Sequence, residues 1–235
     1  MLILFDIDGT LLLTQRAGTE SMQAAARELF GDQFIFTFDG IEIGGWLDPL
    51  IWVAVAEANG IEDPASHHDR FRATYLRHFE ARLARNPTVT ALPGVTELIE
   101  ALSQETDTWL GLLTGNYPEA GRMKLEAAGI DLDSFAVAVW GVDGANRREL
   151  PVVAMAQYAA HTGRTVGSQE VVIIGDTLHD IDCAKANGCR SLAVATGVCS
   201  AAELAAHEPD LLVADLSDTS SILAWILKPV ETVSE

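Results

Sequence analysis

Short apolar runs that end in polar or glycine-containing turns recur along the chain. The runs are continuous rather than alternating, which is typical of parallel strands covered by helices on both faces. The predicted strands are Leu2–Phe5, Trp109–Leu113, Phe135–Val139, Val171–Ile174 and Ser191–Ala195. The pattern therefore predicts a parallel sheet whose strands lead into polar turns.

Helical patterns fill most of the spaces between these strands. The predicted helices are Gly94–Leu102, Pro118–Ala128, Pro151–His161 and Asp180–Asn187. Two of them are followed by glycine, Gly129 and Gly188, which is a common helix stop. Strands that alternate with helices predict an α/β fold with a doubly wound, Rossmann-like sheet.

The segment from residue 14 to residue 90 breaks this alternation. It predicts three helices, Ala17–Phe30, Pro49–Asn59 and Ala65–Arg85, before the α/β pattern resumes at Leu92-Pro93-Gly94. We therefore expect an α/β core domain of residues 1–13 and 91–235 and an inserted helical domain of residues 14–90.

Composition narrows the class of protein. Apolar residues make up 49% and charged residues 21% of the 235 residues, as in a globular protein with a substantial core. The net charge of −19 argues against nucleic acid as a partner. No stretch approaches the roughly 20 apolar residues of a membrane span. Because the three cysteines are odd in number and no basic leader precedes the first apolar run, we expect reduced thiols and a cytoplasmic protein with no membrane partner.

The turn after the first predicted strand has the sequence Asp6-Ile7-Asp8-Gly9-Thr10. Ligands of open α/β sheets bind beyond the carboxyl ends of the strands. A period of two places Asp6 and Asp8 on the same side of an extended chain. Because two neighbouring carboxylates repel each other, this pair needs a cation or a shared proton.

A second acidic turn follows the predicted strand Val171–Ile174. Gly175-Asp176-Thr177 is followed by Asp180, so two further carboxylates lie near a strand end. Hard oxygen ligands of this kind suit Mg²⁺, which combines a few carboxylates with retained waters.

Two other turns carry groups that suit a phosphate. Thr114-Gly115-Asn116 follows a strand, and its hydroxyl and backbone N–H groups can hold an anion. The cations Arg147 and Arg148 precede Leu150-Pro151 and the next helix. Since the carboxyl ends of parallel strands lie at one edge of the sheet, we expect these groups to share a cleft with the acidic turns.

This ordered set of motifs resembles the haloacid dehalogenase-like hydrolase superfamily, in its phosphoglycolate-phosphatase-like branch. The resemblance extends over almost the whole chain and includes Leu92-Pro93-Gly94. The inserted segment lies where that family has its helical C1-type cap. The resemblance implies a Mg²⁺-dependent phosphatase that acts on a small phosphorylated metabolite. We expect a monomer or a homodimer.

The resemblance also implies roles for single residues. Asp6 would attack phosphorus and form an aspartyl phosphate, and Asp8 would protonate the leaving oxygen and then activate water. Thr114 would bind the phosphoryl group. Four neighbouring residues of the same two turns are expected to contribute to phosphate binding: Gly9, Thr10, Gly115 and Asn116.

The resemblance further implies a set of Mg²⁺ ligands and a cationic side chain in the site. Asp176, supported by Asp180, would bind Mg²⁺ together with Asp6 and the main-chain carbonyl of Asp8. Arg147 or Arg148 would replace the lysine that the family usually has. Counting from Pro151 favours Arg148 and counting from the following helix favours Arg147, and a planar guanidinium is not equivalent to an ammonium point charge.

A second departure lies in the inserted segment. The chain has Gly44-Gly45-Trp46-Leu47-Asp48-Pro49 where many relatives resemble Gly-Arg-Thr-Asp, so Trp46 and Leu47 replace polar residues. An altered substrate and a tightly packed helix are both compatible with this change.

Two alternative functions stay open. A sugar phosphomutase of the same superfamily would share the core residues. A non-catalytic phosphoacceptor module also combines clustered aspartates, a threonine and a cation, but such domains are about half this length. A dehalogenase is disfavoured because that branch lacks the aspartate corresponding to Asp8.

Overall fold

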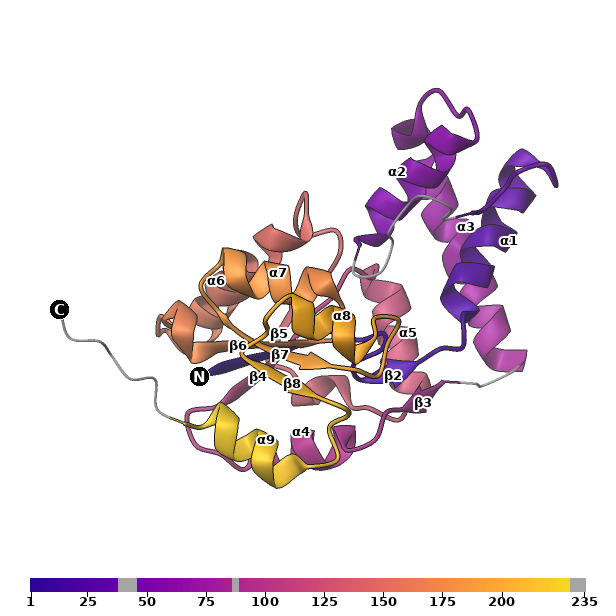
Figure 1. The fold of residues 1–235 in the computed structure, drawn as a ribbon. Coiled ribbons are helices and arrows are strands. Elements are labelled where there is room, and N and C mark those ends of the chain that lie inside the picture. Colours follow the sequence, from indigo (N-terminus) through magenta and orange to yellow (C-terminus); the bar gives the residue numbers. More distant parts are fainter. Residues whose placement is uncertain (38–45, 86–88, 229–235) are drawn as a thin grey trace.

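A computed structural model describes residues 1–37, 46–85 and 89–228 of the chain. Its central sheet has six parallel strands in the order β5-β4-β1-β6-β7-β8 (Figure 1). The strands are β1 (Leu2–Phe5), β4 (Trp109–Leu113), β5 (Val137–Val139), β6 (Val171–Gly175), β7 (Arg190–Val194) and β8 (Leu211–Val213). β1 lies between β4 and β6. The predicted α/β fold with a doubly wound parallel sheet is confirmed.

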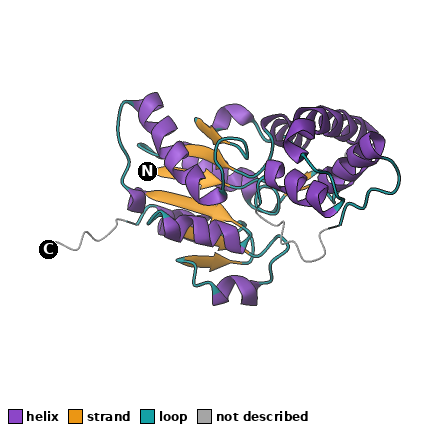
Figure 2. Cartoon of the chain, turned by 90° about the horizontal axis from the view of Figure 1, so that it is seen from above, coloured by secondary structure: helices purple, strands orange, loops and turns teal. Residues whose placement is uncertain are grey.

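Helices cover both faces of this sheet (Figure 2). Ile3 and Phe5 of β1 pack toward α4, α5 and α9, whereas Leu2 and Leu4 pack toward α6 and α7. Successive side chains of a strand point to opposite faces, and both faces are apolar here, so the strand sequences are continuous apolar runs. The helices are α4 (Val95–Ser103), α5 (Pro118–Ala127), α6 (Leu150–Thr162), α7 (Leu178–Ala186), α8 (Ala201–Ala206) and α9 (Thr219–Ile226).

Sequence patterns did not predict several short elements. They are β8, α8, α9 and the antiparallel pair β2 (Leu12–Leu13) and β3 (Thr90–Ala91). Strands of two or three residues are too short for a periodic pattern, and β8 is only half-buried at the sheet edge. The short helices η1 (Leu132–Ser134), η2 (Arg147–Glu149) and η3 (Ser168–Glu170) were also not predicted.

Three helices lie beside the sheet domain: α1 (Ala17–Phe30), α2 (Asp48–Ala58) and α3 (Pro64–Arg85). We call them the helical insert. They share an apolar cluster in which the fully buried Trp52 stacks on Phe71, with ring centroids 4.1 Å apart. Within the described part of the chain, no helix has the length and apolar character needed to cross a membrane.

The helical insert is attached to the sheet domain through the turn after β4. The backbone N–H of Asp48 donates to the carbonyl of Gly115 at 2.7 Å. The Asp48 carboxylate in turn accepts the backbone N–H of Tyr117 at 2.8 Å. Tyr117 and Ala120, at the start of α5, belong to the apolar cluster of the insert. The first turn of α2 is therefore fixed to the strand-to-helix turn that carries Thr114.

Burial raises the pKa of Asp48 to about 6, although Lys124 and the Tyr117 N–H act in the opposite direction. The folded protein therefore holds a proton on Asp48 more tightly than the unfolded chain does. Its contribution to stability is fully present below the unfolded pKa and is lost as pH rises through about 6.

We predict that Asp48→Asn, which keeps an oxygen for the Tyr117 N–H but cannot ionise, removes this pH dependence. Relative to the native chain, the variant should gain on the order of 1 kcal/mol in free energy of unfolding between about pH 4 and pH 8. Urea unfolding in the presence of a chelator measures the difference. A variant that loses stability relative to the native chain over this range would contradict the interpretation.

Candidate active site

The turn after β1 brings its two aspartates to the carboxyl end of the sheet. The backbone N–H of Asp6 donates to the carbonyl of Ile174 in β6 at 2.9 Å, so Asp6 continues the sheet by one residue. Gly9 has φ +80°, and a Cβ atom there would overlap the Asp176 carboxylate. Only glycine allows this turn to lie so close to the end of β6.

Three buried carboxylates converge at this point. Asp6, Asp176 and Asp180 each offer an oxygen, and these oxygens all lie within 4.8 Å of one another. Burial raises the pKa of Asp6 to about 6, with Arg147 opposing and the neighbouring aspartates adding to the shift. Burial and the charges of Asp6 and Asp180 also raise the pKa of Asp176 well above its usual value. The cluster holds more negative charge than its surroundings neutralise.

The donor set of this cluster fits a hard divalent cation. Asp6 and Asp176 supply carboxylate oxygens at neighbouring strand ends, and the Thr10 hydroxyl donates to Asp176 at 3.3 Å. Asp180 is more heavily engaged, because one oxygen accepts from Arg147 and the other accepts the Thr177 N–H and hydroxyl. The excess charge and the oxygen ligands are the features that Mg²⁺ sites share.

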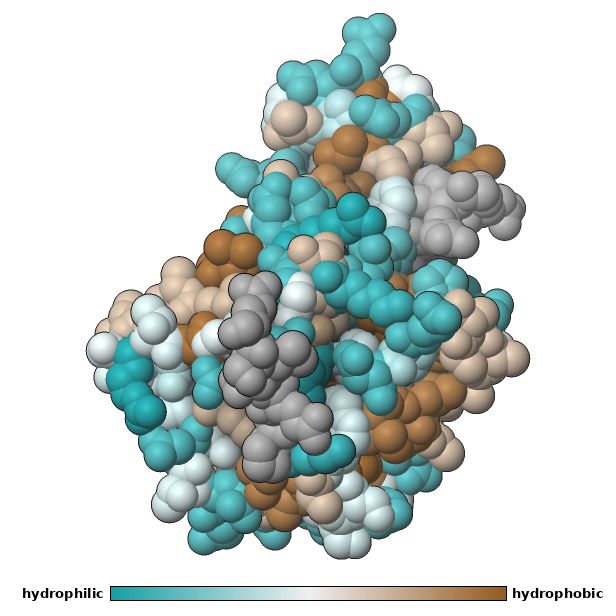
Figure 3. Space-filling view, turned by 60° about the vertical axis from the view of Figure 1, so that its left-hand side comes forward, coloured by the Kyte–Doolittle hydropathy of each residue, from teal (hydrophilic) through white to brown (hydrophobic). Residues whose placement is uncertain are grey.

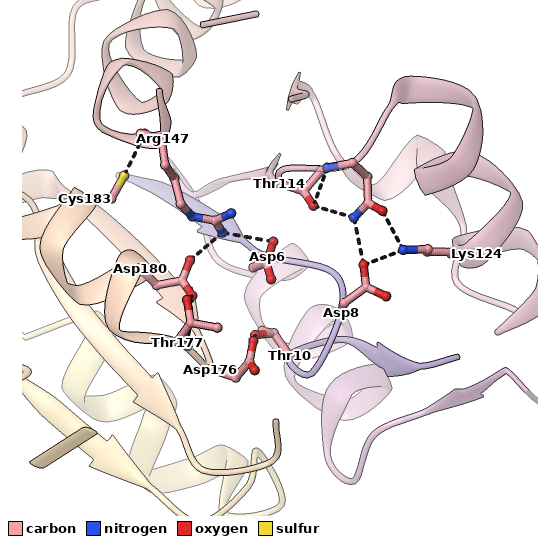
Figure 4. Close-up of polar contacts among 11 residues, drawn as sticks. Asp6, Asp8, Thr10, Thr114, Lys124, Arg147, Asp176, Thr177, Asp180 and Cys183 are labelled. Carbon is pink, nitrogen blue, oxygen red and sulfur yellow. Dashed lines mark hydrogen bonds and ion pairs between the residues drawn. The ribbon is translucent and has the colours of Figure 1, made fainter. Parts of the chain in front are cut away.

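Arg147 is the cation that lies in the cluster (Figure 4). Its side chain is 6% exposed, and Nη2 lies 3.0 Å from Asp6 Oδ1 and 2.5 Å from Asp180 Oδ1. Burial opposes the charge on this guanidinium, but Asp180 and Asp6 outweigh that cost and raise its pKa above the ordinary value. Arg147 therefore stays charged and links the turns after β1 and β6.

Arg148 points away from this cluster. Its side chain is 63% exposed and forms two hydrogen bonds of 2.7 Å with Asp182 on α7. Asn146 caps the short helix η2, because its side-chain oxygen accepts the backbone N–H of Arg148. Consecutive side chains of this helix point in different directions. The sequence left the choice between the two arginines open, and the structure brings Arg147 alone of the two to Asp6.

The turn after β4 contributes the polar groups opposite the carboxylates. Thr114 is fully buried, and its backbone N–H donates to the carbonyl of Val139 at 3.1 Å. The amide nitrogen of Asn116 donates to Thr114 Oγ1 at 2.7 Å and to Asp8 Oδ2 at 2.8 Å. Thr114, Asn116 and Asp8 are thus joined in one network, so the structure brings these three predicted site residues together.

Lys124 on α5 also belongs to this network, and sequence analysis did not identify it. Its Nζ donates to Asp8 Oδ2 at 2.6 Å and to Asn116 Oδ1 at 2.5 Å, and the residue is 5% exposed. A signal was present in the sequence: Lys124 lies on the buried stripe of α5 together with Ala120, Gly121 and Leu125. A lysine in an apolar stripe is rarely buried without a partner.

Trp46 lies beside the same turn. A Cβ atom on Gly115 would overlap the Trp46 carbonyl, so the close approach of the insert requires glycine at position 115. Trp46 belongs to the segment of residues 44–49, which departs from the family pattern, and Gly44 and Gly45 of that segment lie outside the described residues. Trp46 and Asp48 both line the cavity above the carboxylates.

A cavity of about 510 Å³ lies between the sheet domain and the helical insert. Its floor holds the predicted site residues Asp6, Asp8, Gly9, Thr114, Gly115, Asn116, Arg147 and Asp176. Met22, Ile51 and Tyr75 form an apolar wall on the side of the insert. Figure 3 shows the insert as a smaller lobe above the sheet domain, with hydrophilic side chains gathered where the two lobes meet on that face.

Comparison with known proteins gives one consistent result. The family model described as haloacid dehalogenase-like hydrolase matches residues 3–194. The chain is 28% identical over 225 residues to the pyrophosphatase PpaX of Listeria monocytogenes, with 94% of this chain and 95% of that protein covered. It is 26% identical over 231 residues to a 5'-nucleotidase of Pseudomonas aeruginosa, with 94% of each chain covered.

Solved structures agree on the fold. The crystal structure of a hydrolase from Pseudomonas syringae matches with a TM-score of 0.74 at 21% identity, and the match covers 96% of this chain and 98% of that one. The matched residues 3–194 include all of the motifs on which the predicted resemblance rests. The chain belongs to the haloacid dehalogenase-like hydrolases.

Proposed function

We propose that this chain is a Mg²⁺-dependent phosphatase that hydrolyses a small phosphate monoester through an aspartyl phosphate on Asp6. One observation carries the proposal: Asp6, Asp8, Thr114, Arg147 and Asp176 all line a single cavity. The relatives named as a pyrophosphatase and a 5'-nucleotidase support hydrolysis of phosphate groups.

Asp6 is suited to the role of nucleophile by its position. Its carboxylate attacks phosphorus, a P–O bond to Asp6 forms, and the bond to the leaving oxygen breaks. Arg147 holds the attacking carboxylate at 3.0 Å and faces the same space as the Thr114 turn. Both groups can stabilise negative charge on the transferred phosphoryl oxygens, from which most catalysis of phosphoryl transfer comes.

Asp8 is suited to acid–base chemistry because its side chain is 41% exposed to the cavity. It donates a proton to the leaving oxygen in the first step. In the second step it accepts a proton from water as the water oxygen bonds to phosphorus and the bond to Asp6 breaks. Phosphate is released, and Asp6 returns to a carboxylate.

Mg²⁺ would be held by Asp6, Asp176 and the main-chain carbonyl of Asp8, with Asp180 in support. When bound, it would supply positive charge that offsets the repulsion between the carboxylate cluster and an anionic substrate. The convergence of three buried carboxylates supports this assignment, because burial and the neighbouring aspartates raise the pKa of Asp6 and Asp176 and a bound cation would favour their ionised forms.

We further propose that residues 14–90 form a cap domain that selects the substrate. The pairing of β2 with β3 supports these boundaries, since it brings the two ends of the insert together at Leu13 and Thr90. The apolar wall and the small cavity support a small phosphorylated metabolite as substrate. A cytoplasmic enzyme with access to such metabolites fits this proposal.

We predict that Asp6→Asn abolishes turnover of an aryl phosphate in Mg²⁺. The amide is not a nucleophile, so the rate should fall by more than roughly 10³-fold. Phosphate release measures the rate, and circular dichroism checks that the fold survives. Normal turnover by a folded Asp6→Asn variant would exclude the mechanism.

A second prediction compares the two arginines. Arg147→Met removes the donor that faces Asp6, and kcat/KM should fall by about 10²–10³-fold. Arg148→Met is the matched control and should stay within about twofold of the native chain, because its partner Asp182 is a surface residue. Equal losses in the two variants would contradict the assignment of the site cation to Arg147.

A third prediction concerns metal binding without turnover. Mg²⁺ should raise the thermal midpoint of the native chain, because a ligand that binds the folded state alone stabilises it. The shift should be lost in Asp176→Asn and retained in the surface variant Asp182→Asn. Differential scanning fluorimetry with and without chelator measures it. An undiminished shift in Asp176→Asn would place the metal elsewhere.

A further inference from the structure

Lys124 forms one corner of a closed triangle of polar side chains (Figure 4). Its Nζ donates to Asp8 Oδ2 and to Asn116 Oδ1, and Asn116 Nδ2 donates to the same Asp8 oxygen. Each residue of the triangle therefore contacts the other two. Such an arrangement fixes the side-chain angles of all three residues more firmly than a single ion pair would.

The orientation of Asn116 follows from Lys124. A lysine ammonium group has only donors, so it requires the amide oxygen of Asn116 to face it. The amide nitrogen is then directed at Asp8 and at Thr114 Oγ1. Two side chains donate to Asp8 Oδ2, Lys124 and Asn116, and Lys124 sets the orientation of Asn116.

The surroundings of Lys124 leave it little freedom. The residue is 5% exposed, and its ammonium group lies 5.9 Å from the centre of the Phe79 ring on α3. A Cβ atom on Gly18 of α1 would lie 3.8 Å from Nζ. A buried ammonium group is costly unless it is paired, so its position is tied to Asp8 and Asn116.

The two oxygens of Asp8 differ as a result. Among the described residues, the side-chain hydrogen bonds of Asp8 are all at Oδ2. The Asp8 side chain is nevertheless 41% exposed and lines the cavity. One oxygen is anchored to the sheet domain, and Oδ1 is the oxygen that remains for a substrate.

We propose that Lys124 is a positioning residue that holds Asp8 in the orientation needed to protonate the leaving oxygen. This inference rests on the phosphatase function proposed above. Lys124 lines the same cavity, but its two hydrogen bonds go to Asp8 and Asn116, so we assign it a role that acts through these two side chains. Its contribution therefore depends on how much the reaction needs a proton on the leaving oxygen.

That dependence distinguishes positioning from a structural role. An activated leaving group such as 2,4-dinitrophenolate departs as an anion and gains little from a general acid, whereas phenolate is more basic and gains more. A variant that misplaces Asp8 should therefore lose activity mainly toward phenyl phosphate. A variant that only loosens the fold should lose activity toward both esters alike.

The experiment compares the native chain, Lys124→Met and Lys124→Arg on both esters. Lys124→Met keeps the length of the side chain and removes its donors. Its kcat/KM should fall by about 10²-fold on phenyl phosphate and by less than about threefold on 2,4-dinitrophenyl phosphate. Lys124→Arg keeps a charged donor and should recover part of the lost rate. If Lys124→Met does not fold, Lys124→Gln, which keeps a polar group, replaces it with the same expected selectivity.

The same measurement in an Asp8→Ala background closes a double-mutant cycle. If Lys124 acts through Asp8, adding Lys124→Met to Asp8→Ala should change the ratio of the two rates by less than about twofold. Equal losses on both esters in the single variant, or a further selective loss in the double variant, would overturn the positioning role. A native chain inactive on both esters would instead overturn the proposed function.

Discussion

The repulsion among Asp6, Asp176 and Asp180 is the constraint on which the rest of the site depends. Three buried carboxylates within 4.8 Å of one another are stable only where cations and donors face them. Arg147 meets part of this need by contacting Asp6 and Asp180 together. The remaining negative charge is what makes the cluster attractive to a divalent cation and, through that cation, to a phosphate.

The sheet makes such a concentration of charge possible. β1 is flanked by β4 and β6, so the turns that follow these three strands share one edge. The carboxylates lie mainly after β1 and β6, and Thr114 and Asn116 lie after β4 on the other side of Asp6 and Asp8. The helical insert then closes over this edge through Asp48 and Trp46, which both approach Gly115. The turn at residues 114–117 therefore both carries site residues and contacts the insert.

Sequence patterns predicted the strands of the sheet and the polar turns that follow them, because both are encoded by neighbouring residues. Continuous apolar strands ending at Asp6, Thr114 and Asp176 were sufficient to predict the parallel sheet and the meeting of its turns. The choice between Arg147 and Arg148 was not predictable, because it depends on the direction of side chains in a three-residue helix. Lys124 was missed because it comes from the body of a helix, and its contact with Asp8 spans 116 residues. Single contacts of that range leave no periodic pattern in a sequence, and the lysine on the buried stripe of α5 indicates burial without identifying Asp8 as its partner.

Covalent phosphorylation of Asp6 during turnover is the step that most directly distinguishes this mechanism. An acyl phosphate can be reduced by borohydride to the alcohol, which converts the modified aspartate to homoserine. Rapid acid quenching during steady-state hydrolysis, followed by reduction and peptide mass spectrometry, locates the modified residue. We expect homoserine at position 6 in the presence of substrate and Mg²⁺, and none with chelator. Phosphate release without homoserine at that position, or with homoserine at another aspartate, would contradict it.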